Sequence, residues 1–162
     1  MRILREVAAI FGLAVVIGSV CIFWSQLPSQ VPTHFDLSGL PNSYGAKSSL
    51  WTLPTVTILL YCLLSALSRF PGAFNYPFAV AQEERARLQS LMVELVGWLK
   101  AEVMWTFAWL TLTALQVSRG RSHGLNITFA PVTLGVVVIT IGLYWKRMLR
   151  LKSSPQATIT SS

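Results

Sequence analysis

The stretch VAAIFGLAVVIGSVCIFW, residues 7–24, decides the fold of this chain. It is apolar apart from Ser19, and Arg2, Arg5 and Glu6 precede it. A helix of about 20 apolar residues crosses the roughly 30 Å hydrocarbon core of a bilayer. A cleavable signal peptide has a shorter apolar region that ends in small residues, whereas this run ends in bulky ones. The stretch therefore predicts a retained transmembrane helix.

Three further apolar runs follow, at residues 50–67, 95–117 and 127–145. Pro54 and Pro131 lie in the first turns of the second and fourth runs, where a missing amide removes no helical hydrogen bond. Each run is long enough to cross the hydrocarbon core as a helix. The sequence thus predicts an all-α membrane protein with four transmembrane helices, which can pack as a four-helix bundle.

Composition supports a single membrane domain. Of the 162 residues, 53% are hydrophobic and only 12% are charged, against about 25% charged residues in soluble domains. We expect the membrane domain to span residues 1–152 and the polar tail 153–162 to be disordered. The net charge of +7 does not indicate nucleic-acid binding, because the basic residues lie at the ends of apolar runs and form no stripe on one face.

The distribution of Lys and Arg predicts the orientation. With the N-terminus inside, three basic residues fall in outer loops: Lys47, Arg119 and Arg121. Nine fall in cytoplasmic segments: Arg2, Arg5, Arg69, Arg85, Arg87, Lys146, Arg147, Arg150 and Lys152. Cytoplasmic loops of membrane proteins carry this excess. Both termini are therefore expected in the cytoplasm, with the protein in a bacterial cytoplasmic (inner) membrane.

A cytoplasmic helix is predicted at residues 80–92, directly before the third span. Glu83 and Arg87 are spaced i, i+4 in the favourable order. Residues 80–96 contain neither Gly nor Pro. This helix is therefore expected to continue into the span as its cytoplasmic extension.

The loop between the first two spans, residues 27–50, reads LPSQVPTHFDLSGLPNSYGAKSSL. Pro28 and Pro32 favour extended geometry at its start. Gly39, Pro41 with Asn42, and Gly45 supply turn residues that fold the chain back toward the next helix. The loop is therefore expected to be ordered.

Twelve residues of this loop resemble the signature L-P-x-x-V-P-x-H-F-x-x-x-G-x-P-N-x-Y-G-x-K of the bacterial domain of unknown function numbered 1648. They are Leu27, Pro28, Val31, Pro32, His34, Phe35, Gly39, Pro41, Asn42, Tyr44, Gly45 and Lys47. Residues 74–77 and 98–100 also resemble relatives in which such a domain is followed by two more spans. The wider family includes the sporulation-delay-toxin immunity proteins. The resemblance implies a location in the bacterial envelope and a sensing or protective role.

The loop also carries the candidate binding residues His34, Asp36, Gly39, Pro41, Asn42, Tyr44 and Lys47. His34, Asp36 and His123 have suitable donors for zinc, but only the first two are close in sequence, so no metal site is predicted. A structural, hydrogen-bonded His34 is the simpler interpretation. Lys47 has a structural alternative as well, in which it pairs with Asp36 and closes the loop.

A second candidate site lies in the third span. Four residues share one helical face at i, i+4, i+7 and i+11: Trp98, Glu102, Trp105 and Trp109. A carboxylate inside a span usually faces the protein interior or a water-filled cavity and indicates function. The alternative is that Lys100 and Glu102 lie near the cytoplasmic boundary and extend toward water, while the tryptophans mark the interface.

No catalytic motif is present, so the sequence predicts neither an enzyme nor a cofactor. Two hypotheses remain. In the first, the outer loop from His34 to Lys47 recognises a ligand or partner, such as a peptide or another membrane protein, in a sensing, protective or accessory role. In the second, the chain is a transporter or membrane enzyme component that uses Glu102. Apart from the lipid bilayer, the sequence identifies no partner and leaves a homo-oligomer open.

Overall fold

The computed structural model describes residues 1–36, 38–70 and 82–152. The helices are α1 (Arg2–Phe23), α2 (Thr52–Leu67), α3 (Gln82–Ser118) and α4 (Phe129–Lys152). The strands are β1 (Gln30–Phe35) and β2 (Pro41–Ala46), with short 3-10 segments η1 (Trp24–Gln26) and η2 (Lys47–Trp51) before and after them. The predicted polar tail 153–162 and the family likeness at residues 74–77 lie outside the described residues.

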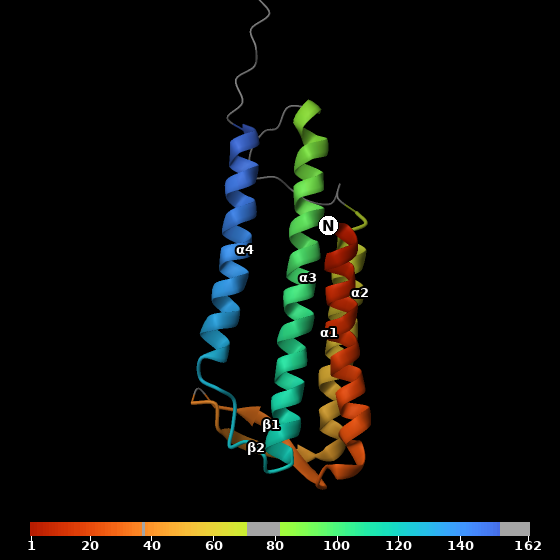
Figure 1. Ribbon diagram of the computed structural model, residues 1–162, viewed down its shortest axis with the longest axis vertical. Coiled ribbons are helices and arrows are strands. Elements are labelled where there is room, and N and C mark those ends of the chain that lie inside the picture. The colour runs from red at the N-terminus through yellow and green to blue at the C-terminus, as the bar shows by residue number, and fades with distance from the viewer. Residues whose placement is uncertain (37, 71–81, 153–162) are drawn as a thin grey trace, which may run out of the picture.

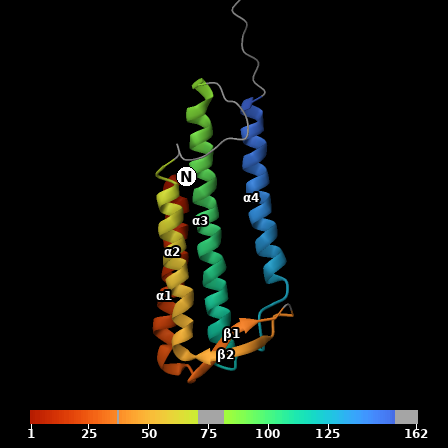
Figure 2. The same cartoon turned by 180° about the vertical axis from the view of Figure 1, so that it is seen from behind.

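The helices run up and down alongside one another, and α3 occupies the centre (Figure 1). Its neighbours α1 and α2 lie on one side and α4 on the other, which the reverse view also shows (Figure 2). The start of α1 and the end of α4 lie at one end of the molecule, and the β1–β2 hairpin lies at the other (Figure 1). Any polar group on α3 therefore has helices on two opposite sides to contact.

Small residues let α1 approach α3 closely. Ala9 and Ala101 are buried together with Met104, and a Cβ added at Gly12 would lie only 3.0 Å from the Met104 Cβ atom. Helices inside membranes associate through such close packing, because lipid tails are as apolar as the side chains. The contact sets the position of α3 against the first helix.

Three helical segments are long and apolar enough to cross a membrane: Arg2–Gln26, Lys47–Leu67 and Phe129–Leu151. Over the described residues, α3 is not among them, so length and composition support three of the four predicted spans. The reason is that α3 carries Lys100, Glu102 and buried threonines, whose side chains lie against other helices. A central helix can be less apolar than the helices around it.

The predicted continuity of the helix before residue 95 with the third apolar run is confirmed from Gln82 onward. The helix α3 has 37 residues, or about 55 Å at 1.5 Å per residue, which exceeds the hydrocarbon core. Residues 80 and 81 and the side chain of Glu83 lie outside the described part, so the expected Glu83–Arg87 pair stays a prediction.

The predicted order of residues 27–50 is also found, but its form corrects the all-α fold class. β1 and β2 form a two-stranded antiparallel hairpin in which Val31 pairs with Gly45 and His34 with Ser43. The register is irregular between Pro32 and His34. The strands were not predicted because Pro and Gly, which supply the turn signals here, are depleted in strands.

The hairpin is attached to the helices by an apolar cluster. Leu27, Val31 and Leu50 are buried against Ala114 and Leu115 near the end of α3. This contact makes the hairpin a fixed cap over one end of the helices.

Candidate functional site

Three polar residues predicted as outer-loop binding groups contact neighbours within the cap. His34 Nδ1 lies 2.7 Å from Asn42 Oδ1 on the facing strand. Asp36 Oδ1 accepts hydrogen bonds from the Ser38 hydroxyl at 2.6 Å and the Leu40 amide at 2.9 Å. The Ser38 hydroxyl bond, followed by the Leu40 amide bond, lowers the pKa of Asp36 below its ordinary value. These contacts give His34, Asn42 and Asp36 structural roles.

Lys47 has a different partner from the expected one. Its Nζ atom lies 4.6 Å from the centroid of the Trp24 ring, and its amide donates to the Ser29 carbonyl at 2.9 Å. The predicted Lys47–Asp36 pair is therefore wrong. The cation–π contact instead joins η2 to η1 at the base of the hairpin.

The hairpin tip contacts the loop between α3 and α4. Gly39 has φ +84°, and a Cβ there would lie 2.1 Å from the Leu125 carbonyl oxygen. The Leu125 amide donates to the Gly39 carbonyl at 2.7 Å. The loop that carries His123 thus lies beside the hairpin, which the sequence did not predict. Within the described residues, no group of three or more His, Cys, Asp and Glu could hold a metal ion.

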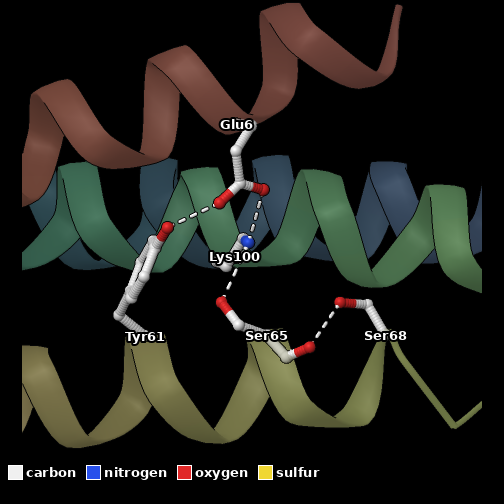
Figure 3. Close-up of polar contacts among 5 residues, drawn as sticks. All are labelled: Glu6, Tyr61, Ser65, Ser68 and Lys100. Carbon is white, nitrogen blue, oxygen red and sulfur yellow. Dashed lines mark hydrogen bonds and ion pairs between the residues drawn. The ribbon is translucent and has the colours of Figure 1, made fainter.

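Lys100 lies in a polar cluster between α1, α2 and α3 (Figure 3). The residue is only 3% exposed. Its Nζ atom donates to Glu6 Oε2 at 2.7 Å and to Ser65 Oγ at 3.1 Å, and the Tyr61 hydroxyl donates to Glu6 Oε1 at 2.5 Å. Lys100 therefore points into the protein and not toward water, because Glu6 meets its charge.

A second polar cluster joins α1, α3 and α4 through an ion pair and a hydrogen bond. Arg5 Nη1 lies 3.7 Å from Glu94 Oε2, which also accepts a hydrogen bond of 3.2 Å from the Tyr144 hydroxyl. A Cβ at Gly97 would lie 3.1 Å from Arg5 Nε, so the glycine makes room for the guanidinium. Sequence reasoning assigned Arg5 only to the cytoplasmic charge excess, and Gly97 was the one local signal of a buried arginine.

Glu102 points in the opposite direction from Lys100. Residues spaced i, i+2 on a helix point in directions about 200° apart. Glu102 therefore faces α4, while Lys100 faces α1 and α2. Glu102 Oε1 accepts a hydrogen bond of 2.5 Å from the Thr140 hydroxyl of α4. Glu102 Oε2 is buried and has no hydrogen-bond partner among the described residues.

A groove of about 420 Å³ opens beside this carboxylate, between α3 and α4. Its volume falls within the roughly 300–1,000 Å³ typical of small-molecule sites. The lining residues are Glu102, Trp105, Thr106, Trp109, Asn126, Thr128, Phe129, Val132, Thr133 and Val136. The Trp109 ring stacks on Phe129 with centroids 5.7 Å apart and planes 10° apart. Glu102 and two tryptophans predicted on its helical face therefore share one cavity wall.

Trp98 does not line this groove. It packs against the buried cluster of Leu88, Leu95, Tyr144 and Met148, nearer the start of α3. The three tryptophans on the predicted helical face therefore have different surroundings. Trp98 packs against the buried cluster, whereas Trp105 and Trp109 line the groove.

Comparisons with known proteins concern mainly the first half of the chain. Residues 9–58 match the family model described as a domain of unknown function, DUF1648. An uncharacterized protein of Archaeoglobus fulgidus is 34% identical over 62 residues, which are 33% of this chain and 34% of that protein. The chain thus spans about a third of the length of the curated relative it matches. No solved structure matches the chain.

The matched segment contains most of α1, the whole hairpin and the start of α2. Many of its signature residues have structural roles in the cap, including His34, Gly39, Asn42 and Lys47. The groove beside Glu102 lies outside the segment. The predicted resemblance to the DUF1648 family is therefore confirmed over residues 9–58 of this chain.

Proposed function

We propose that this chain is a membrane protein whose four helices cross the bilayer and which binds a small ligand in the groove beside Glu102. Both termini lie in the cytoplasm and the hairpin lies outside, in the cytoplasmic membrane of a bacterium. In this orientation nine basic residues lie in cytoplasmic segments and three lie in outer loops, and this excess supports it. On this account the chain acts as a transporter or as the binding component of one.

The position of α3 supports a fourth span. It is the central helix and extends from the end that holds the N-terminus to the hairpin (Figure 1). Its neighbours α1, α2 and α4 contain the three segments that can cross a membrane. A helix packed between spans and parallel or antiparallel to them crosses at the same depth, and its polar side chains contact its neighbours. The proposal therefore has Glu102 within the bilayer.

The observation that carries the proposed site is the unpartnered Glu102 Oε2 atom. Buried polar atoms normally have a hydrogen-bond partner, and leaving a charged one without a partner costs free energy. Lys100 donates hydrogen bonds to Glu6 and Ser65. Among the described residues Arg5 Nη1 is also buried without a hydrogen bond, but it lies 3.7 Å from the counter-charge of Glu94. Glu102 lines a cavity and has one carboxylate oxygen without a hydrogen bond, a combination that is expected of a group that binds a ligand.

Dicyclohexylcarbodiimide tests this assignment, because it is apolar and reacts with carboxyl groups inside membranes. We expect the purified protein in lipid vesicles to take up one label at Glu102, located by mass spectrometry of peptides. Glu102→Gln should abolish the label. Glu94→Gln is the matched control and should leave labelling unchanged, since Glu94 already contacts Arg5 and Tyr144. A label on another carboxylate, or none, would overturn the proposed site.

A second candidate function, recognition of a peptide or another membrane protein by the hairpin, is favoured by two exposed side chains. Leu40 is 51% exposed and Tyr44 is 57% exposed, on a hairpin that is fixed to α3. Such a surface suits the sensing or protective roles of the family that the loop resembles. His34 and Lys47 would then support recognition indirectly, by keeping the hairpin in shape.

A photo-reactive benzoylphenylalanine at position 44, introduced in cells of the native host, tests this second candidate. The same residue at position 59 is the control, because Leu59 is exposed on α2 within a candidate span. Recognition by the hairpin predicts a discrete cross-linked protein from position 44 only. Identical products from both positions, or none, would count against it.

A further inference from the structure

We infer that the ligand of the α3–α4 groove is a lipophilic organic cation, meaning an ammonium or phosphonium group on an aromatic or branched apolar body. The inference rests on the proposed function and adds the chemical class of the ligand. It follows from three features of the groove: its charge, its aromatic wall and its access.

The charge of the groove comes from Glu102. The other lining side chains are aromatic, aliphatic, hydroxyl or amide groups, so no described lining residue carries a positive charge. Among the described residues, the buried basic side chains lie beside other carboxylates: Lys100 donates to Glu6, and Arg5 lies 3.7 Å from Glu94. A carboxylate in such surroundings is stabilised by a cation that comes from outside the chain.

The aromatic residues favour an organic cation over a metal ion. Trp105 and Trp109 line the groove, and Phe129 extends the wall by stacking on Trp109. Ring faces attract cations within about 6 Å, and most strongly when the cation has lost its water. Divalent metal ions prefer several oxygen or nitrogen ligands. In the part of the chain that the structure describes, no group of three or more His, Cys, Asp and Glu could hold a metal ion. Valines complete a lining that suits apolar substituents.

The groove leads from Glu102 toward the α3–α4 loop beside the hairpin. Asn126 and Thr128 lie at that end, and the Asn126 side chain accepts hydrogen bonds from the amide and hydroxyl of Thr128. Trp105 is 44% exposed and Trp109 is 50% exposed, so the groove is also open along its side. An amphiphilic cation can therefore enter from the membrane or from its outer face, whereas a strongly hydrated ion would have to cross apolar surface.

Tetraphenylphosphonium and tetraphenylborate are suitable probes, because they have nearly the same size and shape and opposite charge. Equilibrium binding of each is measured to the whole protein in detergent micelles. We expect saturable binding of tetraphenylphosphonium only. Glu102→Gln should weaken it about tenfold or more, as loss of a charge-assisted contact does, and Glu94→Gln should leave it unchanged.

Two further variants keep the test decisive if Glu102→Gln fails to fold. Val136→Trp fills the groove without altering the carboxylate and should abolish binding. Trp109→Ala removes one aromatic face and should weaken binding roughly three- to thirtyfold, the range expected for one cation–π contact.

The outcomes separate the cation inference from the proposed site. Equal binding of both probes, or unchanged tetraphenylphosphonium binding in Glu102→Gln and Val136→Trp, would overturn the inference. If the carbodiimide labels Glu102 and tetraphenylphosphonium does not bind, the groove stands and the cation assignment is wrong. If neither reagent reaches Glu102, both proposals are wrong.

Discussion

Lys100 and Glu102 are two residues apart on α3, and their charges meet different surroundings. Lys100 is 3% exposed and has Glu6 as its counter-charge, whereas Glu102 has one hydroxyl partner and one unpartnered oxygen. The sequence identified both residues as unusual within an apolar run. It did not separate their roles, because their partners on α1, α2 and α4 come from distant parts of the chain.

Asp36 gives a pH-dependent prediction for the hairpin. Its folded-state pKa lies below the ordinary 3.8, chiefly because the Ser38 hydroxyl donates to the carboxylate. A depressed pKa means that these bonds stabilise the turn above pH 3.8 and that the stabilisation is lost as pH falls through the folded-state value. We expect the carboxyl carbon of Asp36, followed by NMR in micelles, to titrate with a midpoint below 3.8. A midpoint at or above that value would show that the turn is not formed as described.

Gly39 gives a stability prediction at the hairpin tip. Its φ of +84° disfavours any side chain, and an added Cβ would meet the Leu125 carbonyl at 2.1 Å. Gly39→Ala should therefore lower the free energy of unfolding by about 2 kcal/mol or more. Gly18→Ala is the control, because no atom lies within 4 Å of its added Cβ, and alanine is about 1 kcal/mol better than glycine in a helix. Thermal unfolding in detergent measures both, and an equal loss in the two variants would be inconsistent with this contact.

At the scale of elements, the helix positions were predictable and their partners were not. Continuous apolar runs predicted the positions of α1, α2 and α4, although α1 begins five residues earlier and α4 ends seven residues later than the runs. Such runs are informative because helices that face lipid must be apolar. The polar contacts that join them involve Glu6, Tyr61 and Ser65, which are ordinary residues in the sequence of their own helices. Residues 27–50 were predicted to be ordered. Their two strands were not predicted, because proline and glycine are depleted in strands and were interpreted as turn residues.

The Glu6–Lys100 pair predicts non-additive stability changes between α1 and α3. Glu6→Leu leaves the buried Lys100 ammonium without its counter-charge. This should cost about 3 kcal/mol, the low end of the range for broken buried pairs, since the Glu6 side chain remains 43% exposed. The double variant Glu6→Leu with Lys100→Met should recover most of that loss, because no unpaired charge remains. Unfolding free energies of the wild type, both single variants and the double variant measure the coupling, and strictly additive losses would argue against it.

At the scale of the whole molecule, α3 is the helix on which the account depends. It contacts each of the other three helices and contributes Lys100, Glu94 and Glu102 to three separate polar sites. Its moderate hydropathy follows from that position. Hydropathy measures how well a helix suits lipid, and α3 is surrounded largely by protein, so its crossing of the membrane must be tested directly.

Thiol labelling from one side of the membrane is the most direct test. In a variant without Cys21 and Cys62, single cysteines replace Ser43 in the hairpin, Ala86 near the start of α3 and His123 after its end; all three positions are exposed. A membrane-impermeant maleimide is then applied to intact cells. If α3 crosses the bilayer as we propose, Ser43→Cys and His123→Cys are labelled at once, and Ala86→Cys only after the membrane is permeabilised. Labelling of positions 86 and 123 from the same side would contradict the account and remove Glu102 from the bilayer.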